Sequence, residues 1–383
     1  MITGYTVGAM LDGPSYVESA ILYEQESERR LSNSGTVILV GEGCKLYVEH
    51  LSLVLQSGRT HVPQQLACWK LYPGMHEIRR IVILSDKGYV TIDAVNWCCK
   101  QHVEIYMLDR DGNVILTTCG NRANVTLRKK QYDLEKYQIP IATHLLKEKT
   151  FAQIKTLKGL PERLPEEQIV LRFEGTPYAK YSKWIPPSEP LWERLDVGLK
   201  EVDSIKDIDL LRMLEARLAA AYWDAFLGVP IKWKPKDKTI VPPHWKSIST
   251  RVNSMSGTTA RHANNPFHAA VNYAYGVLEA QVLTAINIVG LDPACGYLHA
   301  DKAGRNSLVY DLMEPYRARI DLLVFSLFSK TTFNRGMLVP FDNGECRLAP
   351  QFAKFVVASC MLPQDEINRG IDDLMRFYGP GFD

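Results

Sequence analysis

The sequence predicts an α+β protein with a small, N-terminal β-rich domain over residues 35–122 and a larger, all-α domain over residues 123–383. Alternating or wholly apolar short runs dominate the first part, whereas apolar residues recur at helical spacing in the second. With 383 residues, of which 46% are hydrophobic, the chain is long enough for two separate cores, although a single domain is an alternative. Residues 1–34 lack the basic and apolar regions of a signal peptide, and we treat them as an N-terminal extension.

Five short segments of the first part carry the strand pattern. They are Thr36–Val40, Lys45–Glu49, Arg80–Leu84, Val103–Leu108 and Asn113–Thr117. The Asp-Gly dipeptide before the last of them is a hairpin-turn signal. The run Thr91–Trp97 is better read as a short helix.

Prolines interrupt the helical pattern of the second part at two places. Four prolines lie between Glu174 and Leu195, and four more lie between Gly228 and Pro243. Since proline removes a backbone donor and ends regular structure, we predict loops at both places.

The overall charge does not identify a nucleic-acid binder, because 45 Lys and Arg residues nearly cancel 43 Asp and Glu residues. Two windows are nevertheless basic. Val125–Gly159 holds eight Lys/Arg against three acids, and Ile231–His262 holds seven against one, with Trp233 and Trp245 among them. Such windows suit a phosphate backbone, but a solvated linker face has the same composition.

Cysteine usage and hydropathy argue against a zinc-ribbon protein and against a membrane-spanning helix. The eight cysteines form no C-x-x-C pair, so zinc-ribbon spacing is absent, and reduced thiols in the core of a cytoplasmic protein are expected. No apolar run approaches the ~20 residues that cross a bilayer.

The predicted helix over residues 206–227 carries the first candidate for a functional site, Glu215. This glutamate lies on or beside an apolar stripe formed by Leu211, Leu214, Leu218 and Tyr222. An ionised carboxylate is costly there unless it is paired or binds a cation. The alternative to a functional role is an ion pair with Arg212 on the same helix.

His299 is the second candidate, because it closes the loop G-L-D-P-A-C-G-Y-L between two predicted helices. Loops held by a rigid scaffold often carry catalytic groups. A hydrogen-bonded structural histidine is the alternative.

The predicted helix that starts near Arg305 carries the third candidate, an acidic pair formed by Asp311 and Glu314. The spacing of three places both acids, with Asp321, on the face opposite the apolar one. Pro315 is expected to kink or loosen the helix beside this pair. A solvated acidic stripe is the alternative.

Two or three carboxylates with one neutral imidazole are ligands that suit Mg²⁺ or Mn²⁺, with positions left for water and phosphate. Such a set is typical of phosphoryl transfer, in which the metal neutralises charge on the phosphate and activates the attacking oxygen.

Four motifs resemble the CRISPR-associated integrase, the adaptation endonuclease and integrase family that casposases share. They are L-E-A-R-L-A-A-A-Y-W from Leu214, N-P-F-H-A-A-V-N-Y-A-Y-G-V-L-E-A from Asn265, G-L-D-P-A-C-G-Y-L-H from Gly290 and S-L-V-Y-D-L-M-E-P-Y-R from Ser307. The resemblance extends more loosely from about Gly35 to Leu348. It implies that Glu215, His299 and Glu314 bind Mg²⁺ or Mn²⁺, and that Asp311 is a supporting catalytic residue or a second ligand.

The resemblance also implies a DNA substrate, gripped by cations and an aromatic ring around the metal. The candidates are Arg251, Arg261, His262, Lys302, Arg305, Tyr310 and Arg317. Arg317 could equally pair with Glu314. Asn265, Asn272 and Tyr275 either face the substrate or cap a core helix.

The implied activity is insertion of short DNA into a CRISPR array by attack of a 3′-hydroxyl on a phosphodiester. The implied partners are DNA, a second copy of the chain bound through the β-rich domain, and a small ferredoxin-like adaptation protein. A casposase-type transposase or a family member outside CRISPR is one alternative. A non-catalytic DNA-binding module, whose acids form only salt bridges, is another.

Overall fold

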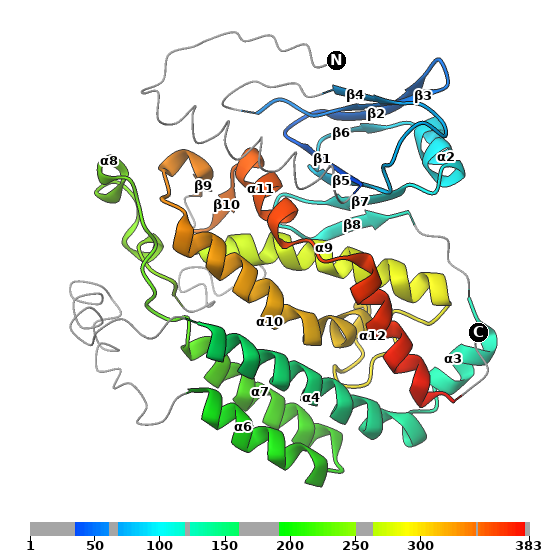
Figure 1. The fold of residues 1–383 in the computed structure, drawn as a ribbon, viewed down its shortest axis with the longest axis vertical. Helices are drawn as coiled ribbons and strands as arrows, with labels where there is room; N and C mark the ends of the chain where they lie inside the picture. The colour runs from blue at the N-terminus through cyan, green and yellow to red at the C-terminus, as the bar shows by residue number, and fades with distance from the viewer. Residues whose placement is uncertain are drawn as a thin grey trace. The chain divides into compact units, whose positions relative to one another are not determined.

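The computed structural model describes residues 35–60, 68–118, 123–160, 191–249, 263–341 and 344–379. They form two compact units (Figure 1). Unit 1 takes the described residues of Met1–Gly120, Asn253–Thr284 and Asn334–Pro363, and unit 2 takes those of Asn121–Val252, Ala285–Phe333 and Gln364–Asp383. The fold class is confirmed, since strands dominate the N-terminal part and helices follow. The units are not the contiguous domains 35–122 and 123–383 of the sequence prediction, because two later segments join unit 1. The proposed extension, residues 1–34, lies outside the described residues.

Two four-stranded sheets form the first part of unit 1. One has the order β1 (Thr36–Val40), β5 (Arg80–Leu84), β7 (Glu104–Leu108) and β8 (Val114–Thr117). Its first three strands are parallel and β8 is antiparallel to β7. The other sheet has the order β4 (Cys68–Leu71), β3 (Ser52–Gln56), β2 (Cys44–Glu49) and β6 (Gly88–Val90).

The two sheets share one apolar core with helix α2 (Ile92–Lys100) (Figure 1). Its members include Leu39 and Ile81 from one sheet, Leu46 and Leu55 from the other, and Trp97 from α2. The five predicted strands and the short helix are confirmed within a few residues. The short strands β3, β4 and β6 were not predicted.

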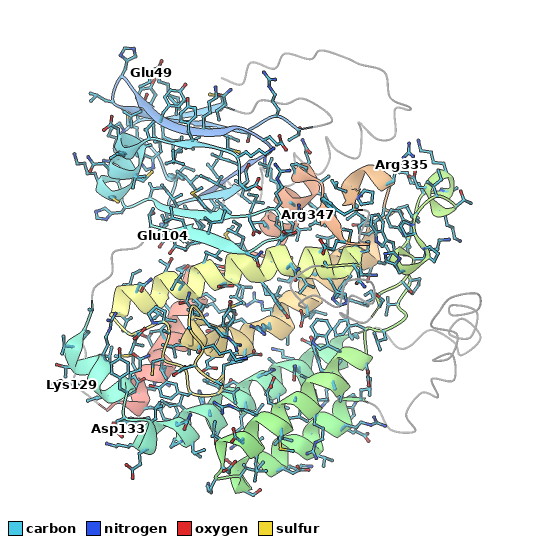
Figure 2. All side chains as sticks on the ribbon, turned by 180° about the vertical axis from the view of Figure 1, so that it is seen from behind. Glu49, Glu104, Lys129, Asp133, Arg335 and Arg347 are labelled. Carbon is cyan, nitrogen blue, oxygen red and sulfur yellow. The ribbon has the colours of Figure 1, made fainter. Side chains whose placement is uncertain are left out.

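Segments from later in the chain complete unit 1. The first part of α9 (Pro266–Val289) approaches the β7–β8 turn so closely that a Cβ on Gly276 would lie 1.8 Å from the backbone oxygen of Gly112. Arg347, which is labelled in Figure 2, lies in the strand β10 (Cys346–Leu348). It forms an ion pair with Asp111 of the same turn, with Nη2 and Oδ2 2.9 Å apart. These contacts explain why the unit is not contiguous in sequence.

Asn265 and the C-terminal segments also belong to unit 1. The Asn265 side chain is fully buried and its oxygen accepts a hydrogen bond from the backbone of Phe267. This geometry corresponds to the capping role rather than to a substrate-facing one. The remaining elements of the unit are β9 (Leu338–Pro340) and α11 (Pro350–Cys360), which packs on β1.

Unit 2 is a bundle of helices that surrounds the candidate site. Its elements are α3 (Val125–Gln131), α4 (Leu134–Gly159), α6 (Leu191–Glu201), α7 (Ile208–Asp224), the short α8 (Pro235–Lys238), α10 (Ser307–Lys330) and α12 (Gln364–Phe377). The long helix α4 packs against α10 on one side and against α6 and α7 on another (Figure 1). No helix in the described part of the chain is both long and apolar enough to cross a membrane.

Two sequence predictions for unit 2 need correction. The predicted loop over Glu174 to Leu195 ends early, because Leu191–Leu195 already belongs to α6, and the rest lies outside the described residues. The predicted loop from Gly228 to Pro243 contains the helical turn α8. Helix α10 runs from Ser307 to Lys330 with Pro315 inside it, so the kink or loosening expected at Pro315 stays a prediction.

The acidic face of α10 is not exposed to solvent. Asp311, Glu314 and Asp321 are all at most 1% exposed. Asp321 accepts a hydrogen bond from the Tyr222 hydroxyl of α7 at 2.9 Å. Other elements of unit 2 therefore cover this face as well as the apolar one, which rules out the solvated acidic stripe.

Candidate active site

Asp311 organises the loop that carries His299. Its two carboxylate oxygens accept backbone N–H bonds from Tyr297, Leu298 and His299 at 2.5, 3.0 and 2.9 Å. Oδ1 also lies 2.7 Å from Nδ1 of His299. Since both oxygens are occupied, the geometry favours the supporting role for Asp311 over that of a second metal ligand.

The contact with Asp311 fixes the orientation of the His299 ring. A carboxylate can only accept, so Nδ1 carries the proton and Nε2 is the nitrogen left to bind a cation. Nε2 lies 3.6 Å from Oε1 of Glu314, and the His299 side chain is 21% exposed. A histidine that binds a metal through one ring nitrogen is commonly oriented by a carboxylate at the other nitrogen, and Asp311 has that place here.

Glu314 lies at the buried end of the site and is surrounded by positive groups. Arg317 Nη1 lies 2.9 Å from its Oε1, and Lys149 Nζ lies 2.8 Å from its Oε2. Burial alone would raise the pKa of the Glu314 carboxyl, but Arg317, Lys149 and His299 outweigh it and lower that pKa to about 2. Glu314 is therefore ionised at neutral pH.

Glu215 joins the cluster from α7, beside the stripe of buried residues Leu211, Leu214, Leu218 and Tyr222. Its partner is Lys149 of α4, which forms a short ion pair with Oε1. Arg212, the expected partner, instead donates to Asp209 and to the backbone oxygen of Leu298. The sequence placed Glu215 correctly on its helix but did not reveal a partner 66 residues away.

Lys149 is the functional-site residue that sequence analysis missed, since it was counted in the basic window Val125–Gly159. It is 6% exposed. Burial would lower the pKa of its ammonium, but Glu314 and Glu215 outweigh burial and raise it. A signal was present, because Lys149 shares a helix face with the buried residues Leu145 and Leu146.

The donor types of this cluster fit a hard divalent cation, since two carboxylates and one imidazole nitrogen come together around one ammonium. As they stand, however, no three acidic, histidine or cysteine side chains in the described ranges are arranged to hold a metal ion. Lys149 lies where the two glutamates converge, so the cluster already binds positive charge.

The candidate DNA contacts are only partly described. Arg251, Arg261 and His262 lie outside the described residues. Lys302 is exposed, and Arg305 lies over the ring of Tyr310 with its Cζ 5.0 Å from the ring centroid. The Tyr310 ring in turn lies 6.3 Å from that of His299, and Arg317 pairs with Glu314. Glu215, His299 and Glu314 form what we call the acid–histidine cluster. Tyr310 and Arg317 thus lie beside this cluster, and Arg305 lies against Tyr310.

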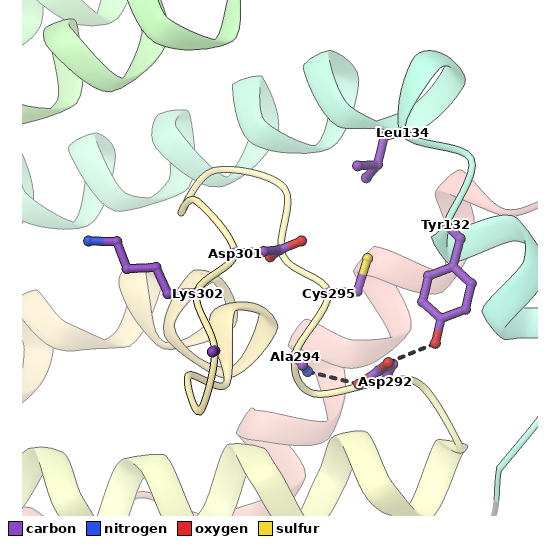
Figure 3. Close-up of a pocket in the computed structure, with 8 residues that line it drawn as sticks. Tyr132, Leu134, Asp292, Ala294, Cys295, Asp301 and Lys302 are labelled. Atoms are coloured by element: carbon purple, nitrogen blue, oxygen red, sulfur yellow. Dashed lines mark hydrogen bonds between the residues drawn. The ribbon is translucent and has the colours of Figure 1, made fainter.

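A cavity of about 480 Å³ lies on another side of the same loop, between the loop and the start of α4 (Figure 3). Asp292, Cys295, Asp301 and Lys302 are among its lining residues. Tyr132 donates a hydrogen bond to Asp292 there at 2.7 Å. None of Glu215, His299 and Glu314 lines this cavity, so it is distinct from the acid–histidine cluster.

The basic windows are less exposed than their composition indicates. In the first, Arg128 and Lys130 donate to backbone oxygens of Gly290 and Tyr378, whereas Lys129 points outward (Figure 2). In the second, Trp233 and Trp245 are buried and stack on each other at 6.2 Å, so they are core residues rather than surfaces for bases. Among the cations of that window that the structure describes, Lys232, Lys236, Lys238 and Lys246 are exposed.

The fold and the site together define a class of protein: an α+β protein with a β-rich unit and a helical unit, in which the helical unit carries a buried cluster of two glutamates and a histidine. Residues 37–360 match the family of CRISPR associated protein Cas1. The chain therefore belongs to the Cas1 family of CRISPR-associated proteins.

Known proteins agree with this assignment. The CRISPR-associated endonuclease Cas1 1 of Pyrobaculum aerophilum is 28% identical over 297 residues, which cover 74% of this chain and 84% of that protein. A casposase bound to its integration product has a TM-score of 0.68 at 23% identity, and the match covers 91% and 94% of the two chains. A Cas6-RT-Cas1–Cas2 complex matches with a TM-score of 0.57 at 13% identity, over 90% of this chain and 35% of that one. Both structures share the fold.

Proposed function

We propose that this protein is a metal-dependent DNA endonuclease and integrase that inserts short DNA into a CRISPR array. One observation carries the proposal: the Asp311 carboxylate turns Nε2 of His299 toward the buried, ionised Glu314. Glu215 of α7 joins them, because it pairs with the Lys149 ammonium that also pairs with Glu314. The family assignment and the name of the Pyrobaculum relative, an endonuclease, support it.

Glu215, His299 and Glu314 would hold the Mg²⁺ or Mn²⁺ ion of this site. When bound, such an ion supplies charge neutralisation at the scissile phosphate and activation of the attacking oxygen. Integration in this account is attack by a 3′-hydroxyl on a phosphodiester of the target duplex. One P–O bond forms as another breaks, so that the target strand leaves with its own 3′-hydroxyl.

The chain's own residues position the reacting groups. Asp311 holds the loop and the Nδ1–H of His299, so that Nε2 keeps one direction. Arg317, with 26% of its side chain exposed, neutralises Glu314 and can reach a phosphate oxygen from its exposed side. Arg305 and Tyr310 form a cationic and aromatic edge beside His299 that suits a strand end.

DNA is the proposed substrate, and two protein partners go with it. One is a small ferredoxin-like adaptation protein, and the match to a Cas6-RT-Cas1–Cas2 complex supports a Cas partner in that place. A second copy of this chain, bound through the β-rich unit, is the other.

The fold shared with a casposase favours one alternative, a transposase-type integration outside a CRISPR array. The chemistry at the site would be the same, and the target DNA would differ. A non-catalytic DNA-binding module is the remaining alternative, and it predicts no reaction under any condition.

A strand-joining assay tests the proposal. The protein is incubated with a short duplex, a supercoiled plasmid and Mn²⁺, with and without an adaptation partner. We expect joined products that require a donor 3′-hydroxyl and disappear with a 3′-dideoxy donor or with Glu215→Gln. Nicking without joining would leave only a nuclease, and neither product would favour the DNA-binding module.

A further inference from the structure

Lys149 is a buried ammonium shared by the two acids of the proposed metal site. Its Nζ forms a short ion pair with Oε1 of Glu215 and lies 2.8 Å from Oε2 of Glu314. The lysine reaches this position from α4, whereas the acids come from α7 and α10. Its side chain is 7% exposed, and solvent therefore screens the interaction weakly.

A divalent ion and this ammonium cannot share the same place. Mg²⁺ and Mn²⁺ need carboxylate oxygens at roughly 2.0 to 2.2 Å, with ligands gathered around one point. The ammonium instead lies between the two carboxylates and engages an oxygen of each. A divalent ion bound to the two carboxylates and an ammonium that still lay between them would also repel each other strongly in a buried site.

A displaced ammonium has an acceptor on its own helix. Gln153 lies one turn further along α4, on the same face as Lys149. Its side-chain oxygen is buried and has no hydrogen-bond partner among the residues that the structure describes. The flexible four-carbon stem of lysine allows its ammonium to turn toward this oxygen without movement of the helix.

We infer that Lys149 is the resident counter-cation of the metal-free site and that divalent metal binds by displacing its ammonium from between Glu215 and Glu314. Lys149 is thus a positioning residue. It keeps the two acids close together without metal and lowers the apparent metal affinity, because each binding event must first break its two ion pairs. The inference rests on the proposed metal site.

Direct metal binding tests the inference without the reaction. The full-length protein is stripped of divalent ions, and Mn²⁺ is titrated by calorimetry into the wild type, Lys149→Met and Lys149→Gln. Lys147→Met is the matched control, because Lys147 lies two residues away on α4 and pairs with Asp203 at the surface. Melting temperatures are measured with and without Mn²⁺.

Both Lys149 variants should bind Mn²⁺ roughly 10- to 100-fold more tightly than the wild type. They should also melt at a lower temperature without metal and gain more from Mn²⁺, whereas Lys147→Met should match the wild type. If one Lys149 variant does not fold without metal, the other variant and refolding in Mn²⁺ still report the exchange.

Two results would overturn the inference, and they are distinguishable. If the wild type binds Mn²⁺ in a Glu215-dependent way but the Lys149 variants bind it no more tightly, the exchange is wrong and the metal site stands. If no form of the protein binds Mn²⁺, the proposed metal site and the exchange both fail.

Discussion

One carboxylate at the site works through another side chain. Asp311 makes four contacts within the loop and with His299, and none with Glu215 or Glu314 among the described interactions. The spacing of Asp311 and Glu314 predicted that the two would act together. It could not predict which acid orients His299 and which would bind metal, because that depends on a loop in which three consecutive backbone N–H groups, those of Tyr297, Leu298 and His299, turn toward Asp311.

Replacement of Asp311 by asparagine should therefore damage both stability and activity. An amide offers one acceptor oxygen and turns an N–H₂ group toward N–H donors, so buried donors lose their partner. We expect a loss of about 2–4 kcal/mol in the free energy of unfolding. Chemical denaturation measures this loss, and strand joining should fall with it.

Asp301→Asn is the control for that change, because Asp301 is exposed and accepts one hydrogen bond, from the Gly296 backbone at 3.1 Å. Its cost should stay below about 1 kcal/mol. An equal effect of the two substitutions would contradict the role given to Asp311.

At the scale of elements, the site depends on how α4, α7 and α10 pack. Periodicity along each helix placed Glu215 beside its apolar stripe and paired Asp311 with Glu314. It left open a solvated acidic stripe on α10 as the alternative to a site, and the burial of Asp311, Glu314 and Asp321 excludes that alternative. A single helix pattern does not record which other elements surround the helix. The pattern of α4 therefore carried a signal for the burial of Lys149 but none for its partners on α7 and α10.

Close approach between elements gives a prediction for α9. Gly276→Ala would normally stabilise a helix by up to about 1 kcal/mol. Here the new Cβ would lie 1.8 Å from the backbone oxygen of Gly112, an atom that cannot rotate away. We expect a net destabilisation of about 1–3 kcal/mol, measured by denaturation.

Gly159→Ala at the end of α4 is the matched change, because no described heavy atom lies within 4 Å of its added Cβ. That variant should be neutral or slightly more stable. A Gly276→Ala protein as stable as the wild type would contradict the packing of α9 on the β7–β8 turn.

At the scale of the whole molecule, the sequence predicted the order of strands and helices better than their grouping. Short apolar runs identified β1, β2, β5, β7 and β8. Nothing local indicated that Asn253–Thr284 and Asn334–Pro363 would join the β-rich unit. Those segments are held there by contacts such as Arg347 with Asp111, 236 residues apart, and single-segment patterns carry no information about such pairs.

Thiol reactivity reports the burial pattern in both units. Burial raises the pKa of the Cys98 thiol, and that of Cys295, to about 12, so few thiolates form at pH 8. Cys68 and Cys99 are exposed. Alkylation at pH 8, read by peptide mass spectrometry, should modify Cys99 at least ~100-fold faster than its neighbour Cys98. Denaturant should remove the difference, and equal rates in the folded protein would contradict the fold around α2.

The central claim is that Glu215, His299 and Glu314 form a metal site once Lys149 withdraws. The most direct measurement is a crystal structure of the protein soaked in Mn²⁺, with an anomalous difference map. We predict one peak within about 2.0–2.4 Å of all three side chains, with the Lys149 ammonium moved away from the two glutamates. A map without such a peak, in which Lys149 still bridges Glu215 and Glu314 at saturating Mn²⁺, would contradict the claim.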